Sequence, residues 1–550
     1  MAAGDRREQT FPKLSSAQIG RVAALGEKRA VARGEILFAQ GDSAIPLFVL
    51  TRGALEVVNP GDHGEVPLVI LEPGEFTGEA TMLSGRRSLV TGRMREDGEV
   101  IAISPKALRV LLEGDPELSD LFMRAFILRR VALIAGRLGD VVLLGSRHSA
   151  DTLRLQEFLT RNGHPFASMD VELDSGARTI LEHFAVRTEE VPILICRGTR
   201  VLKNPSNAEV AECLGFNAQI DARALRDVVV VGAGPAGLAA AVYGASEGLD
   251  VLVVEANAPG GQAGSSSKIE NYLGFPTGIS GQALAGRAYT QAQKFGASIA
   301  IAQRALRLSC RGQPYAVHLD NGTAIRAKTV VLATGAQYRR LPLPELARFE
   351  GSGVYYGATH VEAQLCANED VLVVGGGNSA GQAAVFLAGV ARKVDILVRS
   401  ASLADSMSRY LVRRIEDNPR IALRPFTEIE GLEGKDRLER VHVRNSRTGT
   451  VEARDLHHVF LMTGAVPNTG WLEGCVVLDD RGFVRTGPDL HPDELSAVGW
   501  PLGRPPFLLE TSRPGVFAVG DVRSGNVKRV ASAVGEGSVC IQFVHKALQL

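Results

Sequence analysis

The sequence predicts a multidomain α/β protein whose carboxyl-terminal part contains two similar strand–turn–helix–strand units. Two observations predict this class. The 550 residues exceed the usual size of one domain, and an apolar strand followed by a glycine cluster and an alanine-rich helix occurs twice, from Asp227 and from Asp370. The chain also contains 60 glycines, which suits a fold with tight turns where the backbone approaches a ligand.

Composition excludes several classes of protein. Lys+Arg and Asp+Glu both number 61, so no overall basic field attracts nucleic acid. The first residues lack the apolar core of a secretory signal, and the long uncharged runs at 228–246 and 371–391 are each interrupted early by glycines that would break a membrane helix. We therefore expect a cytoplasmic protein without a membrane or nucleic-acid partner.

The six cysteines show no Cys-x-x-Cys and no metal-ligand spacing. This usage is typical of a reducing cytosol in which most thiols are buried. We expect no metal site.

Residues 1–12 are predicted to be a flexible N-terminus, and residues 13–138 a small β-barrel followed by helices. Short β-like runs lie at 36–38, 47–50 and 55–58. Residues 105–138 then carry apolar side chains at helical spacing.

Motifs within this first domain resemble a cyclic-nucleotide-binding domain. They are Phe-Ala-Gln-Gly-Asp at 38–42, Phe-Thr-Gly-Glu-Ala at 76–80 and Arg-Arg-Ser at 86–88. Backbone N–H groups and a guanidinium together suit a cyclic phosphate. The resemblance implies that cyclic AMP or cyclic GMP binds at Gly78, Glu79, Arg87 and Ser88, with Glu79 accepting from the ribose hydroxyl and Arg87 binding the phosphate. The loop between Glu79 and Arg87 is shorter than usual in the family, and a degenerate domain that binds no ligand is the alternative.

Residues 139–218 alternate strand-like and helix-like segments, at 141–144, 152–162, 167–171, 177–184 and 191–195. This order resembles the thioredoxin/glutaredoxin fold, in which a proline at the position of Pro192 is cis and faces the redox site. The place of that family's Cys-x-x-Cys, residues 147–151, contains no thiol. Because a thiolate is needed to attack a disulfide, we predict a redox-silent docking domain, with Cys196 as a core residue.

The first glycine cluster has the pattern of a Rossmann-like dinucleotide-binding unit. A strand at 227–231 runs directly into Gly232, Gly234 and Gly237. These glycines allow, in order, a tight turn, close approach of the backbone to a pyrophosphate, and close helix packing. Glu255 ends the next strand and can accept a hydrogen bond from a ribose hydroxyl.

The second glycine cluster repeats this unit with one change. Its second strand, 394–398, ends in Arg399 instead of an acid. An arginine there can accommodate a 2′-phosphate, which favours NADPH, whereas an exposed arginine in a site that accepts NADH is the alternative. The predicted contacts are Gly375, Gly377, Asn378, Ser379, Ala380 and Arg399.

Further segments at 259–262, 271–276, 333–336 and 515–521 resemble, one by one, the low-molecular-weight thioredoxin reductase family. The resemblance covers about residues 224–550. It implies an FAD-binding domain at 224–343 and 466–550, an NADPH-binding domain inserted at 344–465, and a homodimer. Asp521 would lie near the ribityl chain or the pyrophosphate, and residues 529–531 would bring N–H groups to the flavin ring. Pattern and resemblance together assign FAD to Gly232, Gly234, Pro235, Ala236, Gly237, Glu255, Gly261, Gln262, Asn271, Thr334, Gly335, Gly520, Asp521, Arg529, Val530 and Ala531.

The sequence departs from that family at the redox-active dithiol. The place of the family's Cys-x-x-Cys holds Ala-Thr-His-Val at 358–361. His360 is a candidate proton donor over the flavin, or an uncommitted polar loop residue. Cys366 is a candidate thiol that lacks a visible partner, or a core residue.

The predicted chemistry is hydride transfer from C4 of NADPH to N5 of FAD, which depends on stacking geometry more than on an acid. The sequence does not identify the electron acceptor. The chain is predicted to be an NADPH oxidoreductase similar to thioredoxin-disulfide reductase, with a thioredoxin-like or ferredoxin-like protein acceptor and regulation by a cyclic nucleotide. A ferredoxin- or quinone-type reductase and a ligand or redox sensor with little turnover are the alternatives.

Overall fold

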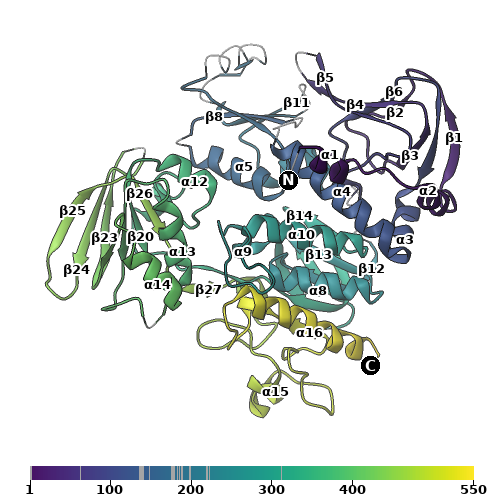
Figure 1. Ribbon diagram of the computed structural model, residues 1–550. Helices are drawn as coiled ribbons and strands as arrows, with labels where there is room; N and C mark the ends of the chain where they lie inside the picture. The colour runs from purple at the N-terminus through teal and green to yellow at the C-terminus, as the bar shows by residue number, and fades with distance from the viewer. Residues whose placement is uncertain are drawn as a thin grey trace.

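The multidomain α/β class is confirmed by the computed structural model (Figure 1). The structure describes residues 3–549 except 62–63, 84, 136–140, 148, 175–176, 178–179, 182–183, 185, 188–189, 197–199, 218–220, 222, 311, 405 and 436.

The first domain contains two sheets, with strand orders β1-β7-β3 and β2-β6-β4-β5. The predicted helical region is two helices, because Asp115 between them is extended and its carboxylate accepts a hydrogen bond from the Leu118 N–H at 3.1 Å. The elements are α1 (Ala3–Thr10), α2 (Ser16–Ala23), β1 (Glu27–Val31), β2 (Ile36–Phe38), β3 (Leu47–Arg52), β4 (Leu55–Gly61), β5 (Gly64–Leu71), η1 (Ala80–Leu83), β6 (Thr91–Met94), β7 (Gly98–Ile103), α3 (Pro105–Gly114) and α4 (Pro116–Ala135).

The segment predicted to be a flexible N-terminus, residues 1–12, contains helix α1 (Ala3–Thr10) in its described part. Arg129 on α4 holds the end of this helix. Its Nε donates to the carbonyl oxygen of Thr10 at 2.9 Å, and its guanidinium lies 4.7 Å from the ring centroid of Phe11. This partner is far away in the sequence, so the short polar helix could not be recognised locally.

The second domain, called here the four-stranded domain, has strand order β11-β10-β8-β9. β8 and β9 are parallel, the other pairs are antiparallel, and the Val191–Pro192 peptide is cis. The thioredoxin/glutaredoxin resemblance of this domain stays a prediction, and four residues of the predicted helix at 177–184 lie outside the described residues. The elements are β8 (Val141–Gly145), α5 (Ala150–Arg161), β9 (Ala167–Asp170), β10 (Ile193–Cys196), β11 (Arg200–Lys203) and α7 (Asn207–Cys213).

The first glycine cluster belongs to a seven-stranded sheet of order β14-β13-β12-β17-β16-β15, with β28 added on β17. The central strands are parallel, and residues 228–231 of β12 are apolar and buried, as expected for a strand covered on both faces. The elements are β12 (Leu225–Val231), α8 (Pro235–Ser246), β13 (Val251–Glu255), α9 (Gly261–Gly264), α10 (Gly281–Lys294), β14 (Ser298–Ile301), β15 (Ala305–Ser309), β16 (Tyr315–Leu319), β17 (Ala324–Leu332), β18 (Ala336–Tyr338), β27 (Ala465–Pro467), η3 (Gly470–Leu472), η4 (Gly487–Asp489), α15 (Pro492–Ala497), β28 (Val516–Ala518), η5 (Gly520–Val522) and α16 (Val530–Leu548).

The second glycine cluster belongs to a parallel sheet of order β19-β26-β20-β21-β22, beside an antiparallel sheet β23-β24-β25. The short pair β18–β27 joins this domain to the preceding one. The elements are α11 (Leu346–Phe349), β19 (Val354–Tyr355), α12 (His360–Leu365), β20 (Asp370–Val374), α13 (Asn378–Leu387), β21 (Lys393–Leu397), α14 (Arg409–Glu416), β22 (Ile421–Arg424), β23 (Thr427–Glu433), β24 (Arg440–Asn445), β25 (Val451–Asp455) and β26 (His458–Leu461).

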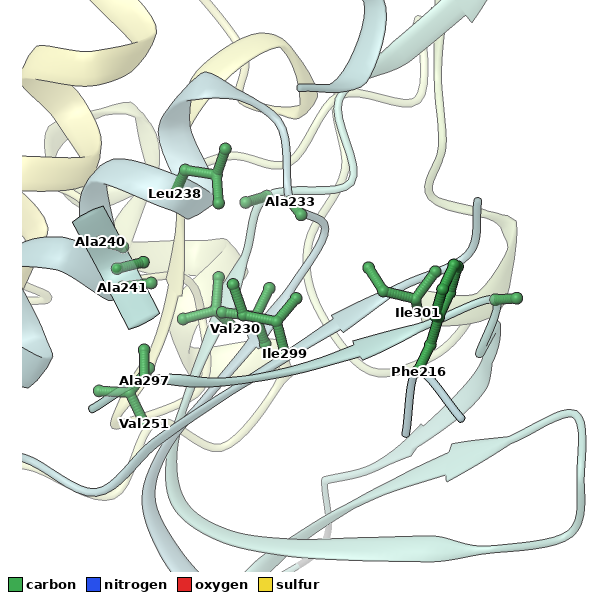
Figure 2. Packing of buried hydrophobic residues seen from close by; sticks show 14 of the residues in the cluster. Phe216, Val230, Ala233, Leu238, Ala240, Ala241, Val251, Ala297, Ile299 and Ile301 are labelled. Atoms are coloured by element: carbon green, nitrogen blue, oxygen red, sulfur yellow. The ribbon is translucent and has the colours of Figure 1, made fainter. Parts of the chain in front are cut away.

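One hydrophobic core joins the four-stranded domain to the sheet of the first glycine cluster. Figure 2 shows Phe216, which follows α7, beside Ile301 of β14. The Asn217 side chain donates to the Ile301 carbonyl oxygen and accepts from the Ile301 N–H, both at 2.8 Å. The four-stranded domain is therefore packed firmly on this sheet.

The cysteine spacing did not predict a disulfide, but Cys310 and Cys475 form one, with Cα atoms 5.9 Å apart. The other four cysteines lie outside this disulfide and are buried. Across the described residues, no helix is both long and apolar enough to span a bilayer.

Candidate functional site

Two glycine loops meet at the carboxyl end of β12. Gly232 has φ +106°, and a Cβ on it would collide with the carbonyl oxygen of Ala333. A Cβ on Gly234 would meet only the Cα of Gly261, at 3.9 Å. Open space therefore lies above Gly234, at the N-terminus of α8, where backbone N–H groups suit an anion.

Glu255 fixes this loop from the neighbouring strand. Its carboxylate accepts hydrogen bonds from the Ala233 N–H at 2.7 Å and the Asn257 N–H at 2.8 Å. Burial raises the pKa of Glu255, and the backbone N–H donors oppose that rise. The carboxylate thus sits where the pattern places a ribose acceptor.

The carboxyl-terminal segment returns to the same loop. A Cβ on Gly520 would lie 2.9 Å from Cβ of Ala236, and burial raises the pKa of Asp521 next to it. Arg529 is the N-cap of α16, so Val530 and Ala531 form its first turn.

The remaining predicted flavin residues lie on connecting segments. Gln262 donates to the Ala336 carbonyl oxygen at 2.5 Å, and Thr334 donates to that of Asn468 at 2.9 Å. A Cβ on Gly335 would meet no atom within 4 Å, whereas Asn271 is exposed.

These residues fit a dinucleotide such as FAD. Gly234 and Gly335 leave space beside backbone that an added side chain would fill. Asn526, five residues after Asp521 in the same segment, has both amide atoms buried without a partner among the described residues. A buried amide without partners is expected where a bound ligand supplies them.

The second glycine loop is built in the same way. Gly375 has φ +144°, a Cβ on Gly377 would meet no atom within 4 Å, and Ala380 is buried in the first turn of α13. The side-chain Oδ1 of Asn378 accepts from the Ser408 N–H at 2.7 Å. Arg399 follows β21 with a side chain that is 83% exposed, 3.7 Å from Glu428, so its guanidinium is accessible to a phosphate.

Tyr338 on β18 lies between the two loops, and the sequence patterns did not identify it. Burial raises the pKa of its hydroxyl, the nearby Asp521 carboxylate adds to that rise, and the side chain of Ser379 in the second loop opposes it. The sequence signal for this residue is an aromatic side chain two positions after the segment 333–336.

The two candidate catalytic residues lie on or beside α12. Cys366 is fully buried, its Sγ lies 3.6 Å from the carbonyl oxygen of Ala363, and burial raises the pKa of its thiol to about 12. This environment argues against a thiolate role, because the reactive form is suppressed. His360 begins α12, and its side chain lies outside the described residues.

The residues predicted to bind a cyclic nucleotide contact other protein groups in the structure. Gly78 has φ +98°, Glu79 forms an ion pair with Arg130 at 3.6 Å, and Ser88 donates to the Val90 carbonyl oxygen at 2.7 Å. Arg87 packs against Gly215 of the four-stranded domain, where its Nε would lie 2.9 Å from an added Cβ. The structure thus does not pair Arg87 with Glu79. Within the described part of the chain, no cluster of three or more metal-ligating side chains occurs.

Comparisons with known proteins agree with this geometry. The family model "Pyridine nucleotide-disulphide oxidoreductase" matches residues 226–537, and the model "Cyclic nucleotide-binding domain" matches residues 28–115. Thioredoxin reductase of Treponema pallidum is 33% identical over 314 residues, which cover 57% of this chain and 94% of that protein. Thioredoxin reductase of Streptomyces clavuligerus is 32% identical over 314 residues, 57% of this chain and 91% of that protein. The crystal structure of Lactococcus lactis thioredoxin reductase superposes with a TM-score of 0.53 at 27% identity, over 59% of this chain and 100% of that one.

Proposed function

Because the chain belongs to the pyridine nucleotide-disulphide oxidoreductase family, we propose that it is an FAD-dependent NADPH oxidoreductase that delivers electrons without a dithiol in its own NADPH-binding domain. The observation that carries the proposal is the pair of glycine loops, in which Gly234 and Gly377 each leave space beside the backbone at the start of a helix. When bound, NADPH supplies a hydride that FAD accepts, a transfer governed by stacking geometry.

Each described group then has a role in holding the cofactors. The first turn of α8 and Gly234 receive the FAD pyrophosphate, and Glu255 accepts from the ribose. Gly377 and the first turn of α13 receive the NADPH pyrophosphate. We place the domain borders at 13–138, 139–218, 224–343 with 466–550, and 344–465.

The missing dithiol decides which acceptors are expected. Residues 358–361 contain no cysteine, and Cys366 is buried. A disulfide protein that accepts the electrons would have to bring its own disulfide to the flavin. The missing dithiol equally supports the second candidate function, a ferredoxin- or quinone-type reductase. A sensor with little turnover is the third.

The experiment is anaerobic titration of the purified protein with NADPH, followed by a panel containing thioredoxin, ferredoxin, a quinone and oxygen. We expect stoichiometric bleaching of the flavin, and reoxidation by one acceptor class. A colourless protein that does not take up FAD would contradict the proposal, whereas bleaching without reoxidation by any acceptor would favour the sensor.

Arg399 provides a test of coenzyme choice. We expect Arg399→Ala to lower the preference for NADPH over NADH by about 10- to 100-fold, the effect of losing a charge-assisted bond of ~1.5–3 kcal/mol. Steady-state kcat/KM with both coenzymes measures it. Arg392→Ala is the matched control, because Arg392 pairs with Asp370 at 2.8 Å, at the opposite end of the strands. Equal effects of the two substitutions would contradict the assignment.

We propose further that a cyclic nucleotide regulates the enzyme through the first domain. A ligand at Glu79 and Arg87 would have to replace their contacts with Arg130 and Gly215. Binding is thereby coupled to the four-stranded domain.

Isothermal titration with cyclic AMP and cyclic GMP tests this regulation. We expect heat from one of them, a change in turnover, and at least about tenfold weaker binding in Arg87→Ala, which lacks the phosphate partner. Arg95→Ala, on an exposed arginine of the same domain, should bind normally. If the unmodified protein gives no heat with either nucleotide and its turnover does not change, the proposed regulation is contradicted.

A further inference from the structure

Helix α5 of the four-stranded domain touches the NADPH-binding domain at its N-terminal end. A Cβ on Gly351 would lie 2.8 Å from Cβ of Ala150. Leu153 is buried in the same core as Tyr355 and Cys366. Figure 1 shows α5 between its own sheet and the elements α9 and α12.

The opposite end of α5 touches the FAD-binding domain at the glycine loop. Arg161 Nη2 donates to the carbonyl oxygen of Gly261 at 2.8 Å. Gln282 of α10 donates to the Thr160 carbonyl oxygen at 2.7 Å, and Asn162 donates to that of Asn257 at 3.3 Å. One helix therefore spans the two dinucleotide-binding domains outside the β18–β27 connection.

The Arg161 contact lies directly beside the predicted pyrophosphate site. Gly261 packs directly against Gly234 at the start of α8, since a Cβ on Gly261 would lie 3.0 Å from the Gly234 Cα. The Arg161 side chain is 14% exposed, and its charge acts on Glu255 in the direction that lowers the pKa of that carboxyl. A mostly buried guanidinium thus holds the peptide that covers the cofactor loop.

The end of α5 is also held by the first domain. The Asn162 carbonyl oxygen accepts from Arg86 at 3.2 Å, and that of Gly163 accepts from Arg130. Arg130 is the ion-pair partner of Glu79. Arg130 therefore connects Glu79 of the predicted cyclic-nucleotide site to Gly163, two residues after Arg161.

We propose that α5 holds the glycine loop of the FAD-binding domain in position. In this proposal Arg161, which lies outside the dinucleotide-binding folds, is a positioning residue for FAD. The inference rests on the FAD-dependent function proposed above. Without the Arg161 guanidinium, the Gly261 peptide loses its anchor and the cofactor loop opens more readily, so FAD leaves faster.

The test compares FAD release from three holoenzymes after dilution, followed by the rise in fluorescence of free FAD. Arg161→Ala should release FAD at least about tenfold faster, the effect of one lost charge-assisted hydrogen bond. Arg161→Lys, which keeps a charged donor, should recover most of this loss. Arg154→Ala is the matched control on the same helix, because Arg154 donates only within its own domain among its described partners, to Asn207 at 2.9 Å and Asn204 at 3.1 Å.

Each outcome decides the inference. Fast release in Arg161→Ala, recovery in Arg161→Lys and normal release in Arg154→Ala support it. Normal release in Arg161→Ala, or equal acceleration in the Arg154 control, overturns it. If Arg161→Ala does not fold, Gln282→Ala takes its place, with release expected about threefold faster for a neutral hydrogen bond and an unchanged rate overturning the inference.

Failure of the broader function gives a different result. An unmodified protein that binds no FAD removes the proposed oxidoreductase function itself. An unmodified yellow protein whose variants all retain FAD equally removes only the role of Arg161.

Discussion

We expect Gly234→Val to purify without the yellow colour of FAD while remaining folded. Among the described residues, the only atom within 4 Å of a Cβ on Gly234 is the Cα of Gly261, at 3.9 Å, so this part of the protein has room for the side chain. The valine methyl groups would instead fill the space assigned to the pyrophosphate. Overpacking costs ~1–3 kcal/mol, and lost contacts with the α8 N–H groups add to it, so we expect FAD affinity to fall by at least about 100-fold.

The ratio of flavin to protein absorbance in the purified material measures this loss, and circular dichroism confirms the fold. Gly286→Ala is the control, because a Cβ on Gly286 in α10 also meets nothing within 4 Å. That variant should keep its flavin and gain ~0.5–1 kcal/mol of helix stability. A yellow Gly234→Val protein would show that the pyrophosphate lies elsewhere.

The dinucleotide-binding units could be predicted because their signals are local. Gly232 has φ +106° and abuts the Ala333 backbone, so the turn itself demands glycine. The apolar run of β12 and the acidic residue that ends β13 lie close together in the sequence, and both indicate the same dinucleotide-binding unit. Resemblance then extended this prediction to the segment around Asp521.

Contacts between domains could not be predicted in this way. A sequence shows that Arg161 is charged, but not that a glycine loop 100 residues away supplies its partner. The same holds for Arg87, assigned to a phosphate by its motif but packed here against Gly215, and for Cys310, which pairs with a cysteine 165 residues later. Tyr338 likewise gains its place only when two separate loops meet around it.

The largest effect on domain docking is expected from substitution of Arg86. This residue is only 8% exposed and contacts three other parts of the chain. Its guanidinium lies 4.0 Å from the ring centroid of Phe216 and donates to the Tyr289 hydroxyl at 2.9 Å. It also donates to the Asn162 carbonyl oxygen at 3.2 Å. Arg86→Ala should therefore weaken docking by ~5–8 kcal/mol, from two charge-assisted hydrogen bonds and one desolvated cation–π contact.

Hydrogen exchange of the backbone amides in α10 and at the end of α5 measures this docking, because undocking exposes both segments to solvent. We expect faster exchange there, with β20 and β21 unchanged. Arg86→Lys should restore little, since an ammonium has no planar face to stack on Phe216 and its donors all come from a single nitrogen. Tyr289→Phe should have a smaller effect that adds little to Arg86→Ala, because the two groups share one bond. Arg95→Ala is the control, with Nε 3.9 Å from Glu56 on an exposed surface, and equal exchange in the Arg95 and Arg86 variants would contradict the docking role.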